Sequence, residues 1–252
     1  AMRAMRSSNP VLSGQIFERN ASVDAGSSVM TINGTINKIG IMLLLLMASA
    51  AYTWRLALEA SDPSRVSTLP AVGVIGGLIM ALITIFRPKS AGFTAPIYAI
   101  FEGLFLGAIS ALLHARYPGI AMQAVLLTIG TLFTMLFLYR SGYIRATPKF
   151  RRGVFMATGA IFFAYMINLI MGFFGMSLGF LHSSGPIGIA VSLVIVVVAA
   201  LNLIMDFDFI EKGSKMAAPK YMEWYGAFGL MVTLIWLYIE ILRLLALLAG
   251  RD

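Results

Sequence analysis

The sequence predicts an all-α membrane protein with seven transmembrane helices. Of its 252 residues, 59% are hydrophobic and 12% are charged, and the mean hydropathy is +0.87. A soluble domain carries about 25% charged residues. Seven apolar stretches follow one another between polar or basic segments. Because a helix needs about 20 apolar residues to cross a bilayer, seven crossings use most of the chain and leave no room for a separate soluble domain.

The first four spans are predicted from their apolar runs and the residues that flank them. Lys38 and Arg55 bound the first span, and Arg87 ends the second. Small residues such as Gly76 and Gly77 in the second span permit close approach of a neighbouring helix. The expected boundaries are 39–54, 69–86, 93–113 and 120–139.

Three further spans complete the predicted domain. A basic loop precedes the fifth span, and Pro186 suits the first turn of the sixth. Trp224 and its neighbouring tyrosines are typical of an interfacial aromatic belt before the seventh. The expected boundaries are 154–174, 186–209 and 228–249. Residues 1–38 are expected to form a flexible polar arm, and residues 39–252 the transmembrane domain.

The distribution of basic residues predicts the orientation. With the N-terminus inside, the inner segments carry 14 Lys and Arg residues. The outer segments carry 4, which are Arg55, Arg65, Arg116 and Arg251. The positive-inside rule therefore predicts a cytoplasmic N-terminus and a C-terminus outside.

Composition also limits the classes of function. The chain has no cysteine, which excludes a disulfide framework, a thiolate nucleophile and a cysteine zinc site. His114 and His182 have no companion ligands, so no fixed metal site and no cofactor are expected. The net charge of +8 comes from loops between spans and is explained by topology, so nucleic acid is not expected as a partner. Membrane lipid is.

Acidic side chains inside the apolar spans are the candidate functional residues. A carboxylate at the centre of a spanning helix costs about 2.5 to 3.5 kcal/mol. Glu102 lies in the third span, Asp206 and Asp208 near the inner end of the sixth, and Glu240 in the seventh. Glu102 is expected to face the bundle interior, and its substitution to have a larger effect than substitution of Glu223.

Asp206, Asp208 and Glu240 also have a purely structural interpretation. Asp208, and less readily Asp206, could be an interfacial group that reaches water. Glu240 could form an intrahelical pair with Arg243, three residues later. Asn202 precedes Asp206 by four residues, so the two share a helix face that is expected to point toward protein or water.

Three segments carry a resemblance to a known family. They are Met205-Asp206-Phe207-Asp208-Phe209-Ile210, Leu237-Tyr238-Ile239-Glu240-Ile241-Leu242, and the passage from Arg87-Pro88-Lys89 to Phe101-Glu102-Gly103-Leu104-Phe105-Leu106-Gly107. Because of the order of these segments and the seven predicted spans, the chain resembles bacterial members of the transmembrane Bax-inhibitor-motif family over residues 39–250.

The resemblance implies a last helix surrounded by the other six and a pH-sensitive calcium leak in a bacterial inner membrane, with calcium as the transported ion. Bacterial members guard the pore with a proton-sharing pair of aspartates, one in each of the last two helices. The matching positions here are Asp206 and Glu240, and the glutamate departs from the family pattern. Arg87 matches the second-helix arginine that bonds the sixth-helix aspartate in the closed state. Calcium would bind only transiently near the pair.

Physical chemistry agrees with such a pair but also raises a difficulty. Two carboxyl groups in a site of low dielectric resist joint ionisation and titrate as a coupled unit, and calcium prefers oxygen ligands. If the seventh helix begins at Phe228, however, Glu240 lies about 18 Å along it. Asp206 is expected within about a turn of the inner end of the sixth helix. Contact between the two acids therefore requires this helix end to lie deeper in the membrane than its hydropathy indicates.

A binding regulator and an intramembrane protease are the two alternative classes of function. Some family members are thought to regulate other membrane proteins, such as proteases or cell-death regulators, by binding them, and the basic N-terminal arm could serve that role. An intramembrane aspartyl protease also uses two acids, but no Gly-x-Gly-Asp element is present at either acid. The chain is therefore not expected to be an enzyme.

Overall fold

The computed structural model describes residues 29–59, 64–175 and 185–250. Most of the predicted N-terminal arm and most of the loop before Pro186 lie outside these residues. Each of the seven long helices in the described part is long and apolar enough to cross a membrane. They are α2 (Ile32–Glu59), α3 (Ser64–Phe86), α4 (Ala91–Arg116), α5 (Ile120–Arg140), α6 (Pro148–Phe173), α8 (Pro186–Lys215) and α9 (Met222–Ala249), with a short 3-10 turn η2 (Pro88–Ser90) before α4. The predicted fold class is confirmed.

Several helices extend beyond the predicted apolar spans. α2 begins at Ile32, so the last residues of the predicted polar arm are helical, and α6 begins at Pro148. α8 continues to Lys215 and α9 begins at Met222. Hydropathy marks only the part of a helix that suits hydrocarbon, whereas the backbone hydrogen bonds continue through the polar interface. The predicted spans that begin at 39, 154 and 228 or end at 209 are therefore shorter than the helices that contain them.

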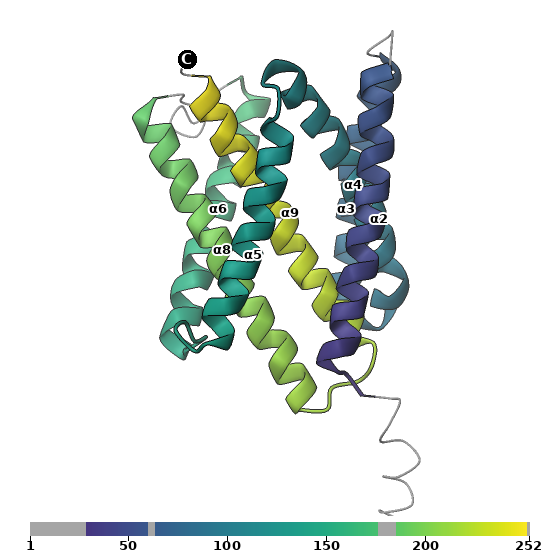
Figure 1. Ribbon diagram of the computed structural model, residues 1–252, viewed down its shortest axis with the longest axis vertical. Coiled ribbons are helices and arrows are strands. Elements are labelled where there is room, and N and C mark those ends of the chain that lie inside the picture. The colour runs from purple at the N-terminus through teal and green to yellow at the C-terminus, as the bar shows by residue number, and fades with distance from the viewer. Residues whose placement is uncertain (1–28, 60–63, 176–184, 251–252) are drawn as a thin grey trace, which may run out of the picture.

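Helix α9 lies between two groups of helices (Figure 1). α2, α3 and α4 form one group, and α5, α6 and α8 form the other. Half of the most apolar part of α9 is buried, the largest share among the seven helices. Its backbone packs against α2, α4, α5 and α8, while α3 packs mainly on α4 and α6 on α8. These contacts do not show the predicted enclosure of α9 by all six other helices.

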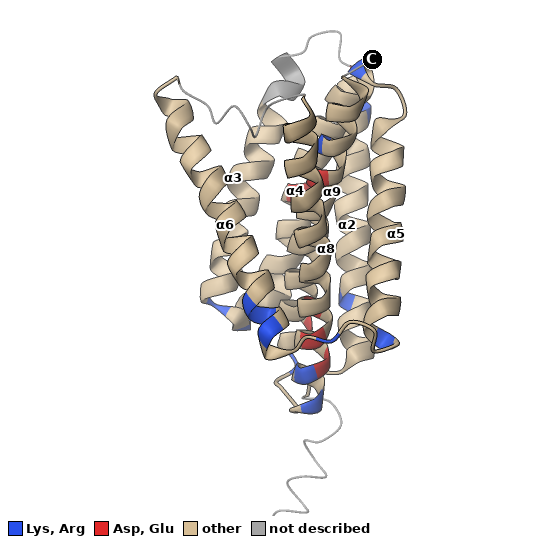
Figure 2. Ribbon diagram, turned by 90° about the vertical axis from the view of Figure 1, so that its left-hand side faces the viewer, with Lys and Arg blue, Asp and Glu red and all other residues tan. Residues whose placement is uncertain are grey.

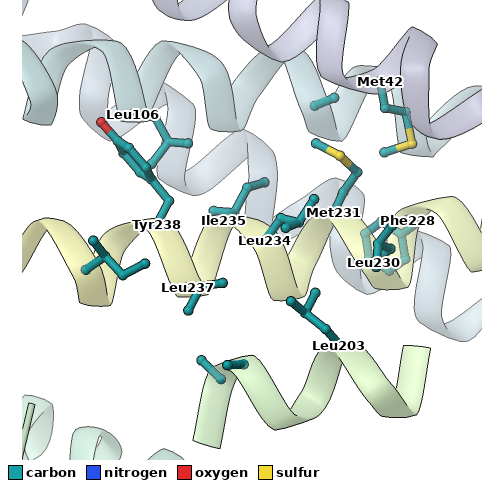
Figure 3. Packing of buried hydrophobic residues seen from close by; sticks show 14 of the residues in the cluster. Met42, Leu106, Leu203, Phe228, Leu230, Met231, Leu234, Ile235, Leu237 and Tyr238 are labelled. Atoms are coloured by element: carbon teal, nitrogen blue, oxygen red, sulfur yellow. The ribbon is translucent and has the colours of Figure 1, made fainter. Parts of the chain in front are cut away.

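The core forms along α9. Met231 and Leu237 on this helix are fully buried, as are Met42 on α2 and Leu203 on α8. Figure 3 shows α9 side chains packed toward α8 and toward the other helix group. The core thus fixes the position of α9 relative to both groups and so positions the acids of α8 and α9.

Two glycines of α4 allow α2 to approach closely. A β-carbon on Gly103 would collide with Ser49 and with the Leu46 carbonyl, and one on Gly107 would collide with the Ala50 carbonyl. Their four-residue spacing places both on the same helix face, as in the small-xxx-small contacts of membrane helices. These contacts fix α2 against α4.

Basic residues gather at the end of the bundle where α2 begins (Figure 2). The helix ends near that side include those of α8, with Lys212 and Lys215, and of α5, with Arg140. The end of α9 lies at the opposite end of the bundle (Figure 1). This charge asymmetry agrees with the predicted loops, and which end faces the cytoplasm remains a prediction.

Cysteine labelling tests this orientation. Ser141 lies beyond α5 at the basic end, and Ala115 lies in the last turn of α4 at the other end; both are exposed. In intact cells, an impermeant thiol reagent should label Ala115→Cys and leave Ser141→Cys unlabelled. Permeabilised cells should label both variants. The reverse pattern in intact cells would contradict the orientation.

Candidate ion pathway and intramembrane acids

Asp206 is an acid at the contact between α8 and α9, and one of its two carboxyl oxygens is unsatisfied. It lies more than two turns before the end of α8 at Lys215, so it is deeper than the sequence suggested. Its Oδ2 atom is buried without a hydrogen-bond partner among the described residues. The carboxyl group faces Gly229, where an added β-carbon would lie 3.9 Å from Oδ1, and the hydroxyl of Thr233. No positive side chain within the described residues forms an ion pair with it.

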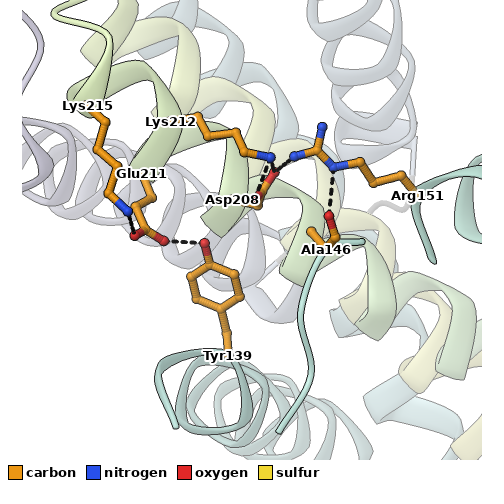
Figure 4. Close-up of polar contacts among 7 residues, drawn as sticks. All are labelled: Tyr139, Ala146, Arg151, Asp208, Glu211, Lys212 and Lys215. Atoms are coloured by element: carbon orange, nitrogen blue, oxygen red, sulfur yellow. Dashed lines mark hydrogen bonds and ion pairs between the residues drawn. The ribbon is translucent and has the colours of Figure 1, made fainter. Parts of the chain in front are cut away.

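Asp208 has a different environment, although it is only two residues away. Arg151 on α6 and Lys212, one turn later on α8, both form ion pairs with it, the latter at 2.9 Å (Figure 4). Arg151 is also fixed by a 3.1 Å hydrogen bond from its Nε to the Ala146 carbonyl. The structure therefore supports the interfacial interpretation of Asp208, whose charge is balanced by two cations.

A second polar contact holds the same end of α8. Glu211 accepts a hydrogen bond from the Tyr139 hydroxyl on α5 and pairs with Lys215 (Figure 4). α8 is thus tied to α6 by Asp208 and to α5 by Glu211. Asp206 lies about half a turn further into the bundle than Asp208 and about one and a half turns further than Glu211.

Glu240 is part of a buried polar network between α6 and α9. Its side chain accepts hydrogen bonds from the Tyr165 hydroxyl at 2.6 Å and from Trp236 Nε1 at 3.3 Å. The Arg243 guanidinium lies 3.5 Å from Glu240 Oε2 and also donates to the Tyr165 hydroxyl. The expected pair with Arg243 is present, and it is one part of a larger network.

The structure does not bring Asp206 and Glu240 into contact. Asp206 faces α9 at Thr233, and Glu240 lies seven residues further along that helix, a rise of about 10 Å. The direct carboxyl pair implied by the resemblance is therefore absent in this conformation. Because α8 and α9 are both longer than their predicted spans, Asp206 and Glu240 both lie further from the inner helix ends than expected. The difference between their two depths is unchanged.

Two residues expected beside Asp206 point elsewhere. Asn202 donates to Thr158 Oγ1 on α6 at 2.8 Å and to the Val198 carbonyl at 2.9 Å, so it does not share a partner with Asp206. Arg87 is exposed at the end of α3, and no ion pair joins it to a described acid. Arg151 is the arginine that binds α8, and it does so at Asp208.

Glu102 lies in a cavity between α3, α4 and α9. The cavity has a volume of about 400 Å³, and Glu102 is the one charged residue in its wall. A carboxylate oxygen of Glu102 lies against Gly77 of α3, where a β-carbon would be only 2.7 Å away. Glu102 is half-buried and is directed at neighbouring helices.

Glu223 is a buried acid that was not predicted from the sequence. This side chain is fully buried in the first turn of α9. It accepts hydrogen bonds from the Thr31 backbone N–H at 3.0 Å and hydroxyl at 2.9 Å, and it pairs with Lys38 at 3.3 Å. Glu223 precedes the buried residues Leu230 and Leu237 by one and two heptads. This spacing indicates that Glu223 lies on the buried face of α9.

A short segment before α2 closes the same end of the bundle. Met30 is 1% exposed, and its sulfur packs against Gly213 of α8 and its methyl near Gly226 of α9. Its backbone N–H donates to the Ala218 carbonyl at 2.7 Å, next to the bridge between Val29 and Pro219. The start of the described chain is therefore fastened to the connection between α8 and α9.

Comparison with known proteins places this architecture in a family. The family model described as Bax inhibitor 1 like matches residues 9–250, nearly the whole chain. The chain belongs to the Bax inhibitor 1 like family. No curated protein and no solved structure matches it.

Membership in the Bax inhibitor 1 like family confirms the resemblance found in the sequence. The matched region contains all seven long helices and the acids Glu102, Asp206 and Glu240. Together with the seven apolar helices, it identifies the chain as an integral membrane protein.

Proposed function

We propose that this Bax inhibitor 1 like protein lets calcium cross the membrane down its gradient, with Asp206 as the group whose protonation reduces the flow. One observation carries the proposal: Asp206 is an acid within a spanning helix, with a buried oxygen that has no hydrogen-bond partner among the described residues. Such an acid is costly in a membrane and commonly marks an ion or proton pathway.

The neighbouring acid is a weaker candidate. Asp208 already pairs with Arg151 and Lys212, so a passing cation would have to displace them. Asp206 has only neutral neighbours on α9, Gly229 and Thr233. Its ionised form therefore attracts a divalent cation without a competing protein charge.

Glu240 acts in this proposal as a second acidic position on the path. It lies further along α9, where Tyr165 and Arg243 hold it. No hydrogen bond or ion pair joins it to Asp206 among the described residues.

Calcium entry into dye-loaded proteoliposomes tests the proposal. Flux through the parent should fall as the pH is lowered from about 8 to about 5, since a protonated carboxyl group carries no charge to attract the cation. Asp206→Asn should flatten this dependence, because an amide does not titrate. Glu240→Gln should keep the dependence, because Asp206 still titrates.

Asp208→Asn and Glu59→Gln are the controls. Glu59 pairs with Arg55 at the far end of α2 and is exposed, so its amide should conduct as the parent does. If Asp208→Asn alone changes the pH profile, the gate belongs to Asp208. If no variant conducts calcium at any pH, the leak fails and a non-conducting regulator that binds other membrane proteins takes its place.

The proposed setting is a bacterial inner membrane, with the N-terminus in the cytoplasm and the C-terminus outside. Calcium is the transported ion, and the protein neither uses a cofactor nor acts as an enzyme. The basic end that carries Lys212, Lys215 and Arg151 supports this placement through the positive-inside rule.

A further inference from the structure

The cavity around Glu102 has the composition of a binding site for an amphiphile. Its volume of about 400 Å³ is in the usual range for a small-molecule site. Glu102 is accompanied in its wall by apolar side chains, a glycine and one tyrosine: Val74, Leu78, Ala81, Ile85, Tyr98, Phe228, Gly229 and Val232. One acid in an apolar wall cannot replace the oxygen shell of a calcium ion.

The cavity opens toward the membrane. Val74 and Leu78 on α3 and Val232 on α9 line it and are exposed by 44%, 58% and 38%. These side chains lie in the interior of spanning helices, so the medium outside them is lipid. Glu102 follows the start of α4 at Ala91 by about 16 Å of helix, well below the headgroups.

The charge of Glu102 is available to a ligand. No hydrogen bond or ion pair reaches its carboxylate from any described residue. The wall also contains Tyr98, one turn before Glu102 on α4, and Phe228 on α9, whose rings meet edge to face at 5.0 Å. A carboxylate beside aromatic rings suits an organic cation, which combines ion pairing with cation–π contact.

From this geometry we propose that the cavity binds a membrane-dissolved amphiphilic ammonium cation, with its charged nitrogen at Glu102 and its apolar part along α3 and α9. The ligand enters sideways from the lipid. Asp206 of α8 does not line this cavity, although Gly229 of α9 borders both.

Binding can be measured with radiolabelled dodecyltrimethylammonium and purified protein in phosphatidylcholine nanodiscs, after subtraction of uptake by empty nanodiscs. The parent should bind it saturably. Excess unlabelled dodecyltrimethylammonium should displace the label, whereas 2,2-dimethyltetradecane, the carbon isostere without the charge, should not. Glu102→Gln should weaken binding by at least about tenfold.

Two further variants make the test specific. Ala81→Leu narrows the cavity while Glu102 keeps its charge, and it should also weaken binding. Glu59→Gln removes an exposed acid on α2 and should bind as the parent does. The proposal is overturned if the parent shows no saturable binding, if the neutral isostere displaces the label equally well, or if Glu102→Gln and Ala81→Leu, each monodisperse on size exclusion, both bind as tightly as the parent.

Discussion

Replacing Gly107 by alanine should destabilise the bundle by about 1–3 kcal/mol, the cost of overpacking a filled contact. The new methyl group would collide with the carbonyl oxygen of Ala50 on α2. A backbone atom cannot turn aside as a flexible side chain can, so α2 and α4 must separate. The midpoint of thermal unfolding of the purified protein in detergent micelles should fall.

Gly130→Ala is the matched control for this substitution. Gly130 lies within α5, and nothing is within 4 Å of its added β-carbon. Alanine also favours a helix over glycine by up to about 1 kcal/mol, so this variant should be as stable as the parent or more so. Equal midpoints for the two variants would refute the close contact between α2 and α4.

Glu223→Ala should cost about 2–3 kcal/mol of folding free energy. The substitution leaves two donors of Thr31 without their acceptor and Lys38 without its partner. Hydrogen bonds to a charged group contribute about 1.5–3 kcal/mol, and Lys38, which is 24% exposed, recovers part of its loss in water. Glu59→Ala removes an exposed ion pair and should leave the unfolding midpoint unchanged.

A double-mutant cycle isolates the ion pair within this contact. Lys38→Met and Glu223→Ala should together destabilise by less than the sum of the single effects, with a coupling of about 0.5–3 kcal/mol. Strict additivity would show that Lys38 and Glu223 do not interact in the folded protein.

The sequence predicts the helices well because hydrocarbon imposes a strict length and composition on each span. The seven spans and the order of the acids follow from that constraint. The ends were less predictable: Asn33, Thr35 and Lys38 look like a polar arm, yet they belong to α2. Their polar groups are compatible with a helix at the interface, and Thr35 is fully buried there.

The arrangement of the acids was less accessible to sequence reasoning. Spacing along one helix shows which residues share a face, but it does not show which neighbour that face meets. Asn202 and Asp206 are four residues apart, yet they turn to α6 and α9 respectively. The pairing of Asp208 with Arg151 depends on how α6 packs against α8, which no local pattern reports.

The contact between Thr31 and Glu223 joins residues 192 positions apart. It therefore constrains biosynthesis as well as the folded state. Thr31 and Lys38 have no acceptor at Glu223 until α9 has been made. A chain cut off before Met222 lacks Glu223, so this closure forms only after α9 has been made.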